Sequence, residues 1–419
     1  MSSLLWPGDH RADDLFSDAA VLDAMMHVEV AWSEAMVSAG IAPAEAAVTF
    51  EQLQSALSRA DLDAIAVDAE SGGNPVIPLI ARLRPRLGTG AGQWLHRGLT
   101  SQDVVDTALM LEASRAFRRI TGLLTQHIER LAILAERHRV TAQVARTLTQ
   151  QAVPSSFGLK VAHWLDGVLA AHEQVMTLRF PVQLGGAAGT LSGAVELAGA
   201  LHDPVLAVER AVGSTASALG LAEESPWHVV RAPVTRHAEA AAACTAAWGH
   251  IANDVLTMSR SEIGEVAEGT GGGSSTMPHK SNPTLSVLIR RAALTSPTAV
   301  ATLQLASADA ADERTAGAWH AEWATFATLL RRTVVAASQT ADLLDGLTVS
   351  EAAMARNLSA AGDSVLSEHR SMAELAQRPA VTDPRGAAEL LIDRTLQRAR
   401  AVLGDEQLRS SLDDARGPQ

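Results

Sequence analysis

The chain has 419 residues, of which 47% are hydrophobic and 19% charged, and its formal net charge at pH 7 is −13. This length allows two or three domains, and the composition is that of a globular protein with ample core material. The acidic balance disfavours a nucleic-acid-binding protein, which needs a basic surface. No run of about 18 apolar residues is present, so no membrane span is predicted.

The N-terminus predicts the location of the protein, and the single cysteine excludes an intramolecular disulfide. Residues 1–14 carry acids early and lack the charged and then apolar order of a signal peptide, so the predicted location is cytoplasmic. Cys244 has no second cysteine to pair with, which excludes an intramolecular disulfide. Because Cys244 lies in an alanine-rich stretch, we predict that it is a small core residue.

Helical periodicity dominates the chain, whereas strand-type alternation is hard to find. One predicted helix face is formed by Ile120, Leu124, Ile128, Leu131 and Leu134. Residues 158–178 and 238–261 show the same pattern, and all three segments exceed the average helix length. These long, alanine-rich segments predict an all-α fold with a central long-helix bundle.

Breakers divide the chain into three predicted domains. Residues 71–78 and 85–92 flank a predicted helix-poor connection, so an N-terminal helical domain should end near residue 98. The strongest loop signal covers residues 264–283, and the helices shorten after Gly346. We therefore predict domains over residues 1–98, 99–345 and 346–419, the middle one being the helix bundle.

The most informative stretch is residues 269–283, GTGGGSSTMPHKSNP. Its glycines predict a backbone able to close over a ligand. Asn282 before Pro283 predicts a helix start whose free N–H groups would favour an anion. Lys280 adds positive charge, and it is one of two lysines among 34 basic residues. A plain linker would not run into a capped helix, and a phosphate loop needs glycine where His279 stands.

Two other polar segments are candidates for ligand binding. In residues 96–107, HRGLTSQDVVDT, Thr100 and Asp103 predict a helix N-cap with an acid three residues later, and capping alone would explain them. In residues 146–160, RTLTQQAVPSSFGLK, Gln150 and Gln151 predict a polar loop before a long helix. An ordinary connection between helices is the alternative for this second segment.

The motif GSSTMPHKSNP, residues 273–283, resembles the signature G-S-S-x-M-P-x-K-x-N of the fumarase/aspartase superfamily. Within this superfamily, residues 100–107, 184–194 and 312–323 resemble the bacterial enzymes that lactonise 3-carboxy-cis,cis-muconate. The resemblance runs from about residue 15 to about residue 344. It implies a three-domain all-α fold and a homotetramer whose core takes helices from four subunits. Each active site would then combine motifs from three chains.

The resemblance also implies roles for particular residues. Ser274 would be the catalytic base, activated by a positive field that also stabilises an aci-carboxylate intermediate. The implied contacts to a small di- or tricarboxylate substrate are His96, Thr100, Ser101, Gln150, Gln151, Ser275, Met277, Lys280, Asn282 and Arg314. Trp319 and His320, near Arg314, are equally explained by packing in a long helix. No cofactor is implied, and the sequence holds no metal or dinucleotide signature.

Leu148 limits which reactions of the superfamily fit this chain. Adenylosuccinate lyases, which are similar here, read R-T-H-G-Q-P-A, and their histidine protonates a basic leaving group. A carboxylate, with a pKa of about 4, needs no such acid. The resemblance therefore implies a lactonising cycloisomerase, or alternatively a lyase that expels a weakly basic anion, such as nitrite from nitrosuccinate. A non-enzymatic lens protein, also known in this superfamily, would not need Ser274, Lys280 and Asn282.

Overall fold

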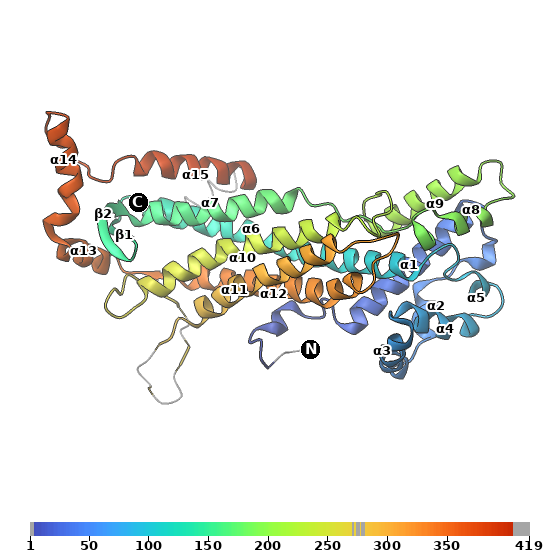
Figure 1. Cartoon of the computed structure of the whole chain (residues 1–419). Coiled ribbons are helices and arrows are strands. Elements are labelled where there is room, and N and C mark those ends of the chain that lie inside the picture. The colour runs from blue at the N-terminus through green and yellow to red at the C-terminus, as the bar shows by residue number, and fades with distance from the viewer. Residues whose placement is uncertain (1–3, 270–271, 274–276, 278–280, 405–419) are drawn as a thin grey trace. The chain divides into compact units, whose positions relative to one another are not determined.

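The computed structural model describes residues 4–269, 272–273, 277 and 281–404. Helices make up most of this part of the chain, with two small antiparallel sheets, so the all-α prediction is confirmed (Figure 1). The chain divides into unit 1, residues 1–118, 177–239 and 298–332, and unit 2, residues 119–176, 240–297 and 333–419. The three predicted domains remain a prediction.

Unit 1 is built around α1 (Asp18–Ser38) and α9 (Pro204–Leu219). Its shorter helices are α2 (Phe50–Ser55), α3 (Arg59–Gly72), α4 (Val76–Arg86), α5 (Ala91–Trp94) and α8 (Ser192–Leu197), with 3-10 turns at Asp9–Ala12, Ala44–Ala46 and Gly186–Ala188. Trp32 and Met36 of α1 are buried in one apolar cluster with Val208 and Val212 of α9. Val182 and Leu184 of the segment 182–191 are buried in the same cluster.

Unit 2 combines α7 (Phe157–Met176) with a hairpin and the C-terminal helices. The hairpin is β1 (Ala142–Thr147) and β2 (Gln150–Ser156), and a second sheet pairs β3 (Val266–Ala267) with β4 (Thr348–Val349). The C-terminal elements are α13 (Glu351–Ala360), a 3-10 turn at Gly362–Leu366, α14 (Ser367–Leu375) and α15 (Ala388–Leu403). Helix α15 lies along α7 (Figure 1), where Arg398 contacts Asp166 at 2.7 Å and Glu173 at 2.9 Å.

Four long helices contribute residues to both units: α6 (Ser101–Arg137), α10 (Ala232–Met258), α11 (Thr284–Ala308) and α12 (Ala318–Gly346). The predicted face of α6 is confirmed, because Ile120, Leu124, Ile128 and Leu131 are fully buried and Leu134 is half-buried. Cys244 of α10 is buried as predicted, and burial raises the pKa of its thiol to about 12.

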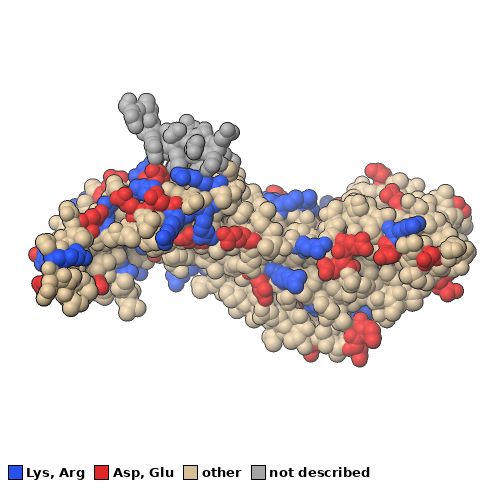
Figure 2. Space-filling view, turned by 90° about the horizontal axis from the view of Figure 1, so that it is seen from above, with Lys and Arg blue, Asp and Glu red and all other residues tan. Residues whose placement is uncertain are grey.

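The surface of the described residues mixes charges of both signs. On the face shown in Figure 2, arginine side chains are interspersed with aspartates and glutamates and form no continuous basic area among the residues coloured there. Within the described ranges, no helix is both long and apolar enough to cross a membrane.

The predicted helix-poor connection between residues 78 and 85 is wrong, because α4 covers it. Asn74 caps this helix: its Oδ1 accepts from the backbone N–H groups of Val76 at 3.1 Å and Ile77 at 3.4 Å. Pro78 lies in the first turn, where a missing N–H costs no helical hydrogen bond. Leu79 and Leu83 are fully buried, so tertiary packing outweighs the two prolines.

The predicted polar loop around Gln150 and Gln151 is also corrected, because it is a β-hairpin. Leu148 and Thr149 form its turn with φ angles of 47° and 70°. Positive φ at both turn residues is the hairpin geometry that usually selects asparagine or glycine. A leucine and a β-branched threonine give no such signal, so the turn could not be predicted from the sequence.

His127 makes the stability of unit 2 sensitive to acid. Its Nε2 donates to Ala337 O at 3.1 Å, its ring meets Trp248 edge-on, and burial lowers its pKa to about 4. Between about pH 6.5 and 4 only the unfolded chain takes up this proton, so stability falls as the pH falls, in total by about 3 kcal/mol.

In wild type, the unfolding free energy should fall between pH 7 and pH 4 by an amount to which His127 contributes about 3 kcal/mol. We expect this fall to be about 3 kcal/mol smaller in His127→Phe. Urea denaturation of wild type and variant at both pH values measures this difference. The control is His202→Gln, since His202 is exposed. An unchanged pH dependence in His127→Phe would show that His127 is not the titrating group.

Candidate active site

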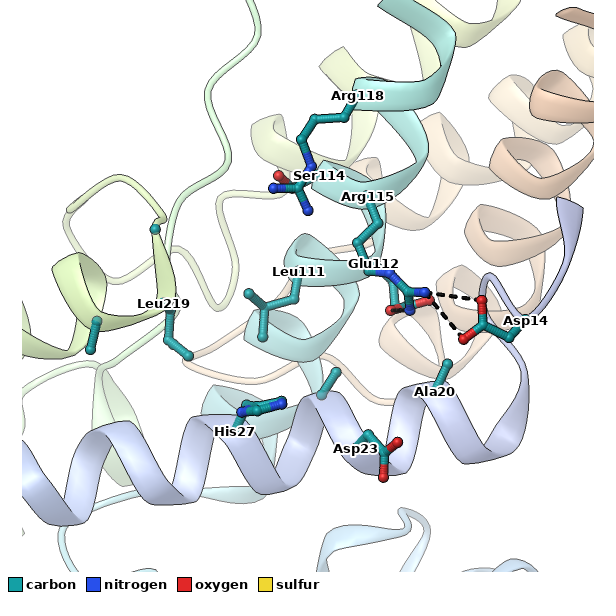
Figure 3. Close-up of a pocket in the computed structure, with 13 residues that line it drawn as sticks. Asp14, Ala20, Asp23, His27, Leu111, Glu112, Ser114, Arg115, Arg118 and Leu219 are labelled. Atoms are coloured by element: carbon teal, nitrogen blue, oxygen red, sulfur yellow. Dashed lines mark hydrogen bonds and ion pairs between the residues drawn. The ribbon is translucent and has the colours of Figure 1, made fainter. Parts of the chain in front are cut away.

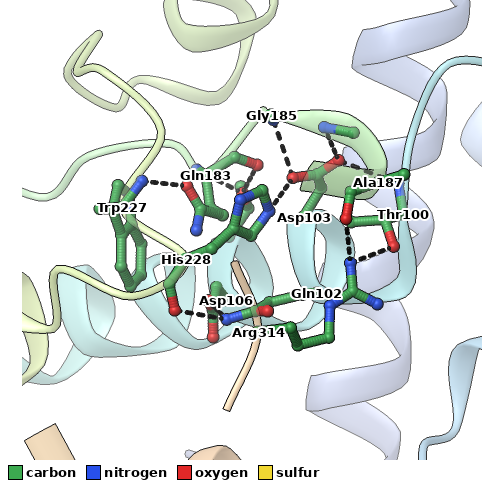
Figure 4. A network of polar contacts seen from close by, with 12 residues as sticks. Thr100, Gln102, Asp103, Asp106, Gln183, Gly185, Ala187, Trp227, His228 and Arg314 are labelled. Carbon is green, nitrogen blue, oxygen red and sulfur yellow. Dashed lines mark hydrogen bonds and ion pairs between the residues drawn. The ribbon is translucent and has the colours of Figure 1, made fainter. Parts of the chain in front are cut away.

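Unit 1 brings two predicted site residues together at the start of α6. Thr100 directly precedes the helix, and its backbone N–H donates to Asp103 Oδ2 at 2.9 Å, which confirms one half of the predicted cap. The Thr100 hydroxyl does not cap the helix. It accepts from Nη2 of Arg314 at 2.8 Å, and the same nitrogen donates to Ala187 O at 3.1 Å (Figure 4). Ser101, the first residue of α6, is half-buried beside this pair.

Arg314 is exposed and keeps donors available. Only its Nη2 atom has a partner within the described residues, so Nε and Nη1 can bind a ligand. The N–H groups of Nε and Nη1 lie on different edges of the guanidinium, and each can donate a charge-assisted hydrogen bond to a carboxylate oxygen. Thr100, Ser101 and Arg314 can therefore form a carboxylate-binding group, and we call them the Arg314 group below.

His96 lies before this group in a strained backbone conformation, with φ at 60°. Its Nδ1 contacts Glu29 Oε1 of α1 at 2.7 Å, and its side chain is mostly buried. Burial alone would lower the pKa of His96, but the Glu29 carboxylate outweighs burial and raises it. The imidazole is thus held by Glu29 of α1. Its contact with a substrate stays a prediction.

Two buried networks support the start of α6, and the sequence did not predict either. In the first, the fully buried Asp103 accepts from Gly185 N, Gly186 N and His228 Nε2, each at 2.9 Å (Figure 4). Burial raises the pKa of the Asp103 carboxyl, while its contact with His228 opposes that shift. A short Asp-x-x-Asp spacing on α6 was the available signal, but the partners lie more than 80 residues away.

The second network surrounds Arg231, the residue directly before α10. Its guanidinium lies 2.7 Å from Asp106 and 2.6 Å from Glu322 of α12, and all three side chains are buried. Burial raises the pKa of Glu322, and Arg231 opposes this shift. Trp319 Nε1 donates to Asp106 Oδ1 at 2.9 Å, so Trp319 has a polar contact beyond packing. This network joins α6 and α12 through the residue that directly precedes α10.

Unit 2 carries the hairpin residues. Gln150 and Gln151 are exposed on β2, and the Leu148 side chain in the turn is 96% exposed. The hairpin is held at its base by the fully buried Glu265, whose carboxylate accepts from Arg146 at 2.7 and 2.9 Å and from Gln143 at 2.8 Å. Arg146 is thereby occupied, and no residue from 147 to 151 carries a titratable side chain.

The signature motif is described in part. Gly272 and Asn282 exchange two backbone hydrogen bonds of 2.8 Å, and Asn282 Nδ2 contacts Gly273 O at 3.5 Å. The Met277 side chain is 41% exposed. Ser274, Ser275 and Lys280 lie outside the described residues.

The predicted helix after this motif exists, with two corrections. It begins at Thr284 rather than Pro283, and Asn282 is paired with Gly272 instead of capping it. Its first N–H groups are not free: Glu268 accepts from Leu285 N at 3.0 Å and from Ser286 N at 2.7 Å. A glutamate from the preceding segment thus occupies the anion position that the helix N-terminus offers.

A cavity in unit 1 and the possible metal ligands were the remaining candidates for a site among the described residues. A cavity of about 480 Å³ between α1, α6 and the end of α9 is lined by none of the predicted site residues. Arg115 in this cavity already contacts Asp14 and Glu112 (Figure 3). In the described ranges, no group of three or more His, Cys, Asp or Glu side chains is placed to hold a metal ion.

Known proteins match this chain over most of its length. The sequence matches the family described as Lyase over residues 10–295. A 3-carboxy-cis,cis-muconate cycloisomerase of Pseudomonas aeruginosa is 37% identical over 417 residues, which cover 94% of this chain and 85% of the relative. The chain belongs to the fumarase/aspartase superfamily. It is therefore an enzyme with a small-molecule substrate, as the motifs predicted.

Two further matches are to a lyase and to a lactonizing enzyme. A nitrosuccinate lyase of Streptomyces davaonensis is 42% identical over 361 residues, which cover 84% of this chain and 75% of the relative. The crystal structure of the 3-carboxy-cis,cis-muconate lactonizing enzyme from Pseudomonas putida superposes with a TM-score of 0.78 at 31% identity, covering 96% of this chain and 92% of that chain. The superfamily is thus established, and its matched members include both a cycloisomerase and a lyase.

Proposed function

We propose that this enzyme is a 3-carboxy-cis,cis-muconate cycloisomerase that works by serine acid–base chemistry. The observation that carries the proposal is Leu148, an apolar and exposed residue in a hairpin turn without titratable side chains. Such a turn cannot protonate a basic leaving group, but a reaction in which a carboxylate adds or leaves needs no proton there. The matches to the Pseudomonas aeruginosa cycloisomerase and to the Pseudomonas putida lactonizing enzyme cover 94% and 96% of this chain, which supports the cycloisomerase as the first candidate.

In the proposed mechanism, the Arg314 group, Lys280 and Asn282 hold the carboxylates of the substrate. The distal carboxylate oxygen forms a bond to the ring-closing carbon, and the electron pair of the double bond moves onto the neighbouring carboxylate as an aci-carboxylate. Cationic and N–H donors around that group stabilise the developing charge. The Ser274 hydroxyl gives its proton to the carbon, which completes 4-carboxymuconolactone, and regains a proton from solvent. Both reacting groups belong to the substrate.

Nitrosuccinate lyase activity is the second candidate, favoured by the 42% identity with the Streptomyces davaonensis enzyme. Here Ser274 would remove a proton next to a carboxylate, the aci-carboxylate would form, and nitrite would leave to give fumarate. Nitrite is a weak base, so it too can leave without an acid at Leu148.

Parallel assays on the purified enzyme separate the two candidates. One follows the loss of ultraviolet absorbance of 3-carboxy-cis,cis-muconate, and the other measures nitrite released from nitrosuccinate. Fast loss of the diene with little nitrite supports the cycloisomerase. Nitrite release without loss of the diene would overturn it in favour of the lyase.

We also propose a homotetramer in which each active site combines residues from different chains, as the superfamily resemblance implies. Ser274→Ala and Arg314→Ala would then damage parts of a site that different subunits supply. We expect co-expression of the two variants to restore activity, because some sites in mixed tetramers contain neither substitution. Activity equal to the average of the two parents would instead place both residues of a site in one chain.

A further inference from the structure

The fully buried Asp103 carboxylate is shared by three separate segments of unit 1. Its Oδ1 accepts from Gly185 N and His228 Nε2, and its Oδ2 accepts from Gly186 N and Thr100 N, all at 2.9 Å. Four donors on two oxygens fill the acceptor capacity of an ionised carboxylate and leave no place for an acid proton. The carboxylate thus holds all three segments in place at once.

Close packing makes this arrangement specific to the residues present. A Cβ atom at Gly185 would lie 2.5 Å from Cε1 of His228, so only glycine lets the imidazole reach Asp103. Gly186 has a φ of 66°, which other residues rarely adopt. The backbone carbonyl of His228 is held in turn by Gln102 Nε2 at 3.0 Å. His228 is thus fixed at both its ring and its backbone.

Both acceptors that hold Arg314 depend on this carboxylate. Thr100 supplies a hydroxyl oxygen, and its backbone N–H is bound by Asp103. Ala187 supplies a carbonyl oxygen one residue after Gly186, whose N–H donates to the same Oδ2 atom of Asp103 that accepts from Thr100 N. Because Nη2 is fixed in this way, the free Nε and Nη1 atoms of the guanidinium are held in one orientation (Figure 4).

We propose that Asp103 and His228 are positioning residues that set the orientation of Arg314 for a substrate carboxylate. The inference rests on the proposed function, because it assumes that the Arg314 group binds a carboxylate of the substrate. His228 acts by donating from Nε2 and Asp103 by accepting, so neither needs to touch the substrate. Loss of the His228 donor should let the 185–187 turn and Thr100 move apart and weaken substrate binding more than the chemical step.

A double-mutant cycle tests the proposal. His228→Leu removes the donor, and we expect KM to rise about 10-fold or more while kcat changes less than about 3-fold, since small misplacements of a binding group are costly. His228→Gln can still donate from its amide and should restore KM to within about 3-fold of wild type. In the Arg314→Ala background, His228→Leu should raise KM no further, because contacts that act through one residue are not additive.

Independent effects of the two substitutions on KM would overturn the proposal, as would a lower melting temperature with unchanged KM. The same cycle is measured by calorimetric titration with tricarballylate, a tricarboxylate that cannot react. If wild type turns over neither substrate, the proposed function fails, and tricarballylate binding still decides the role of His228. Wild type that binds no tricarballylate would overturn the inference itself.

Discussion

Replacing Ser274 by alanine is expected to lower kcat by about 10²- to 10⁴-fold, the typical contribution of positioned proton transfer. The substrate carboxylates are held by other residues in the proposed mechanism, so KM should change little. Steady-state kinetics on the substrate that wild type turns over measures both constants. An unchanged melting temperature shows that the loss is chemical.

The control for Ser274→Ala is Ser261→Ala, at an exposed serine whose described side-chain contact is with Glu262. This control should keep wild-type kcat and KM. Near-normal activity of Ser274→Ala would remove that serine from the mechanism and leave the proposed acid–base chemistry without its central residue.

The largest expected loss of stability follows from Arg231→Met. The substitution leaves the carboxylates of Asp106 and Glu322 buried, without the guanidinium that now lies within 2.7 Å of each. Removing one partner of a buried ion pair typically costs about 3–5 kcal/mol. Urea denaturation should therefore show a lower free energy of unfolding by about this amount.

Two comparisons make the Arg231 result specific. Arg130→Met breaks an ion pair with Asp345 in which both side chains are more than half exposed, and it should cost less than about 1 kcal/mol. Combining Arg231→Met with Asp106→Asn and Glu322→Gln removes the unpaired charges and should recover part of the loss. A triple variant no more stable than Arg231→Met would attribute the loss to packing rather than to buried charge.

The sequence predicted the features that depend on local patterns. The apolar stripe from Ile120 to Leu131 was sufficient to identify α6, and the order Thr100 to Asp103 was sufficient to locate its first turn. The signature motif at 273–283 identified the superfamily because its fixed residue types lie within a few positions.

The missed features depend on contacts between distant segments. Asp103 looked like a local capping residue, yet its carboxylate also accepts from Gly185 and His228, which are 82 and 125 residues away. Glu268 was not predicted to fill the N-terminus of α11, because only the fold brings its side chain there. The helix α4 forms despite Pro78 and Pro85, since burial of its apolar face outweighs local propensity.

The measurement that tests the central claim most directly is kcat/KM of the wild-type enzyme on 3-carboxy-cis,cis-muconate, compared with nitrosuccinate under the same conditions. We predict a kcat/KM above about 10⁴ M⁻¹ s⁻¹ for the muconate, within the usual range of enzymes on their own substrates, and a far lower value for nitrosuccinate. The reverse order would contradict the cycloisomerase and assign the same serine chemistry to nitrite elimination.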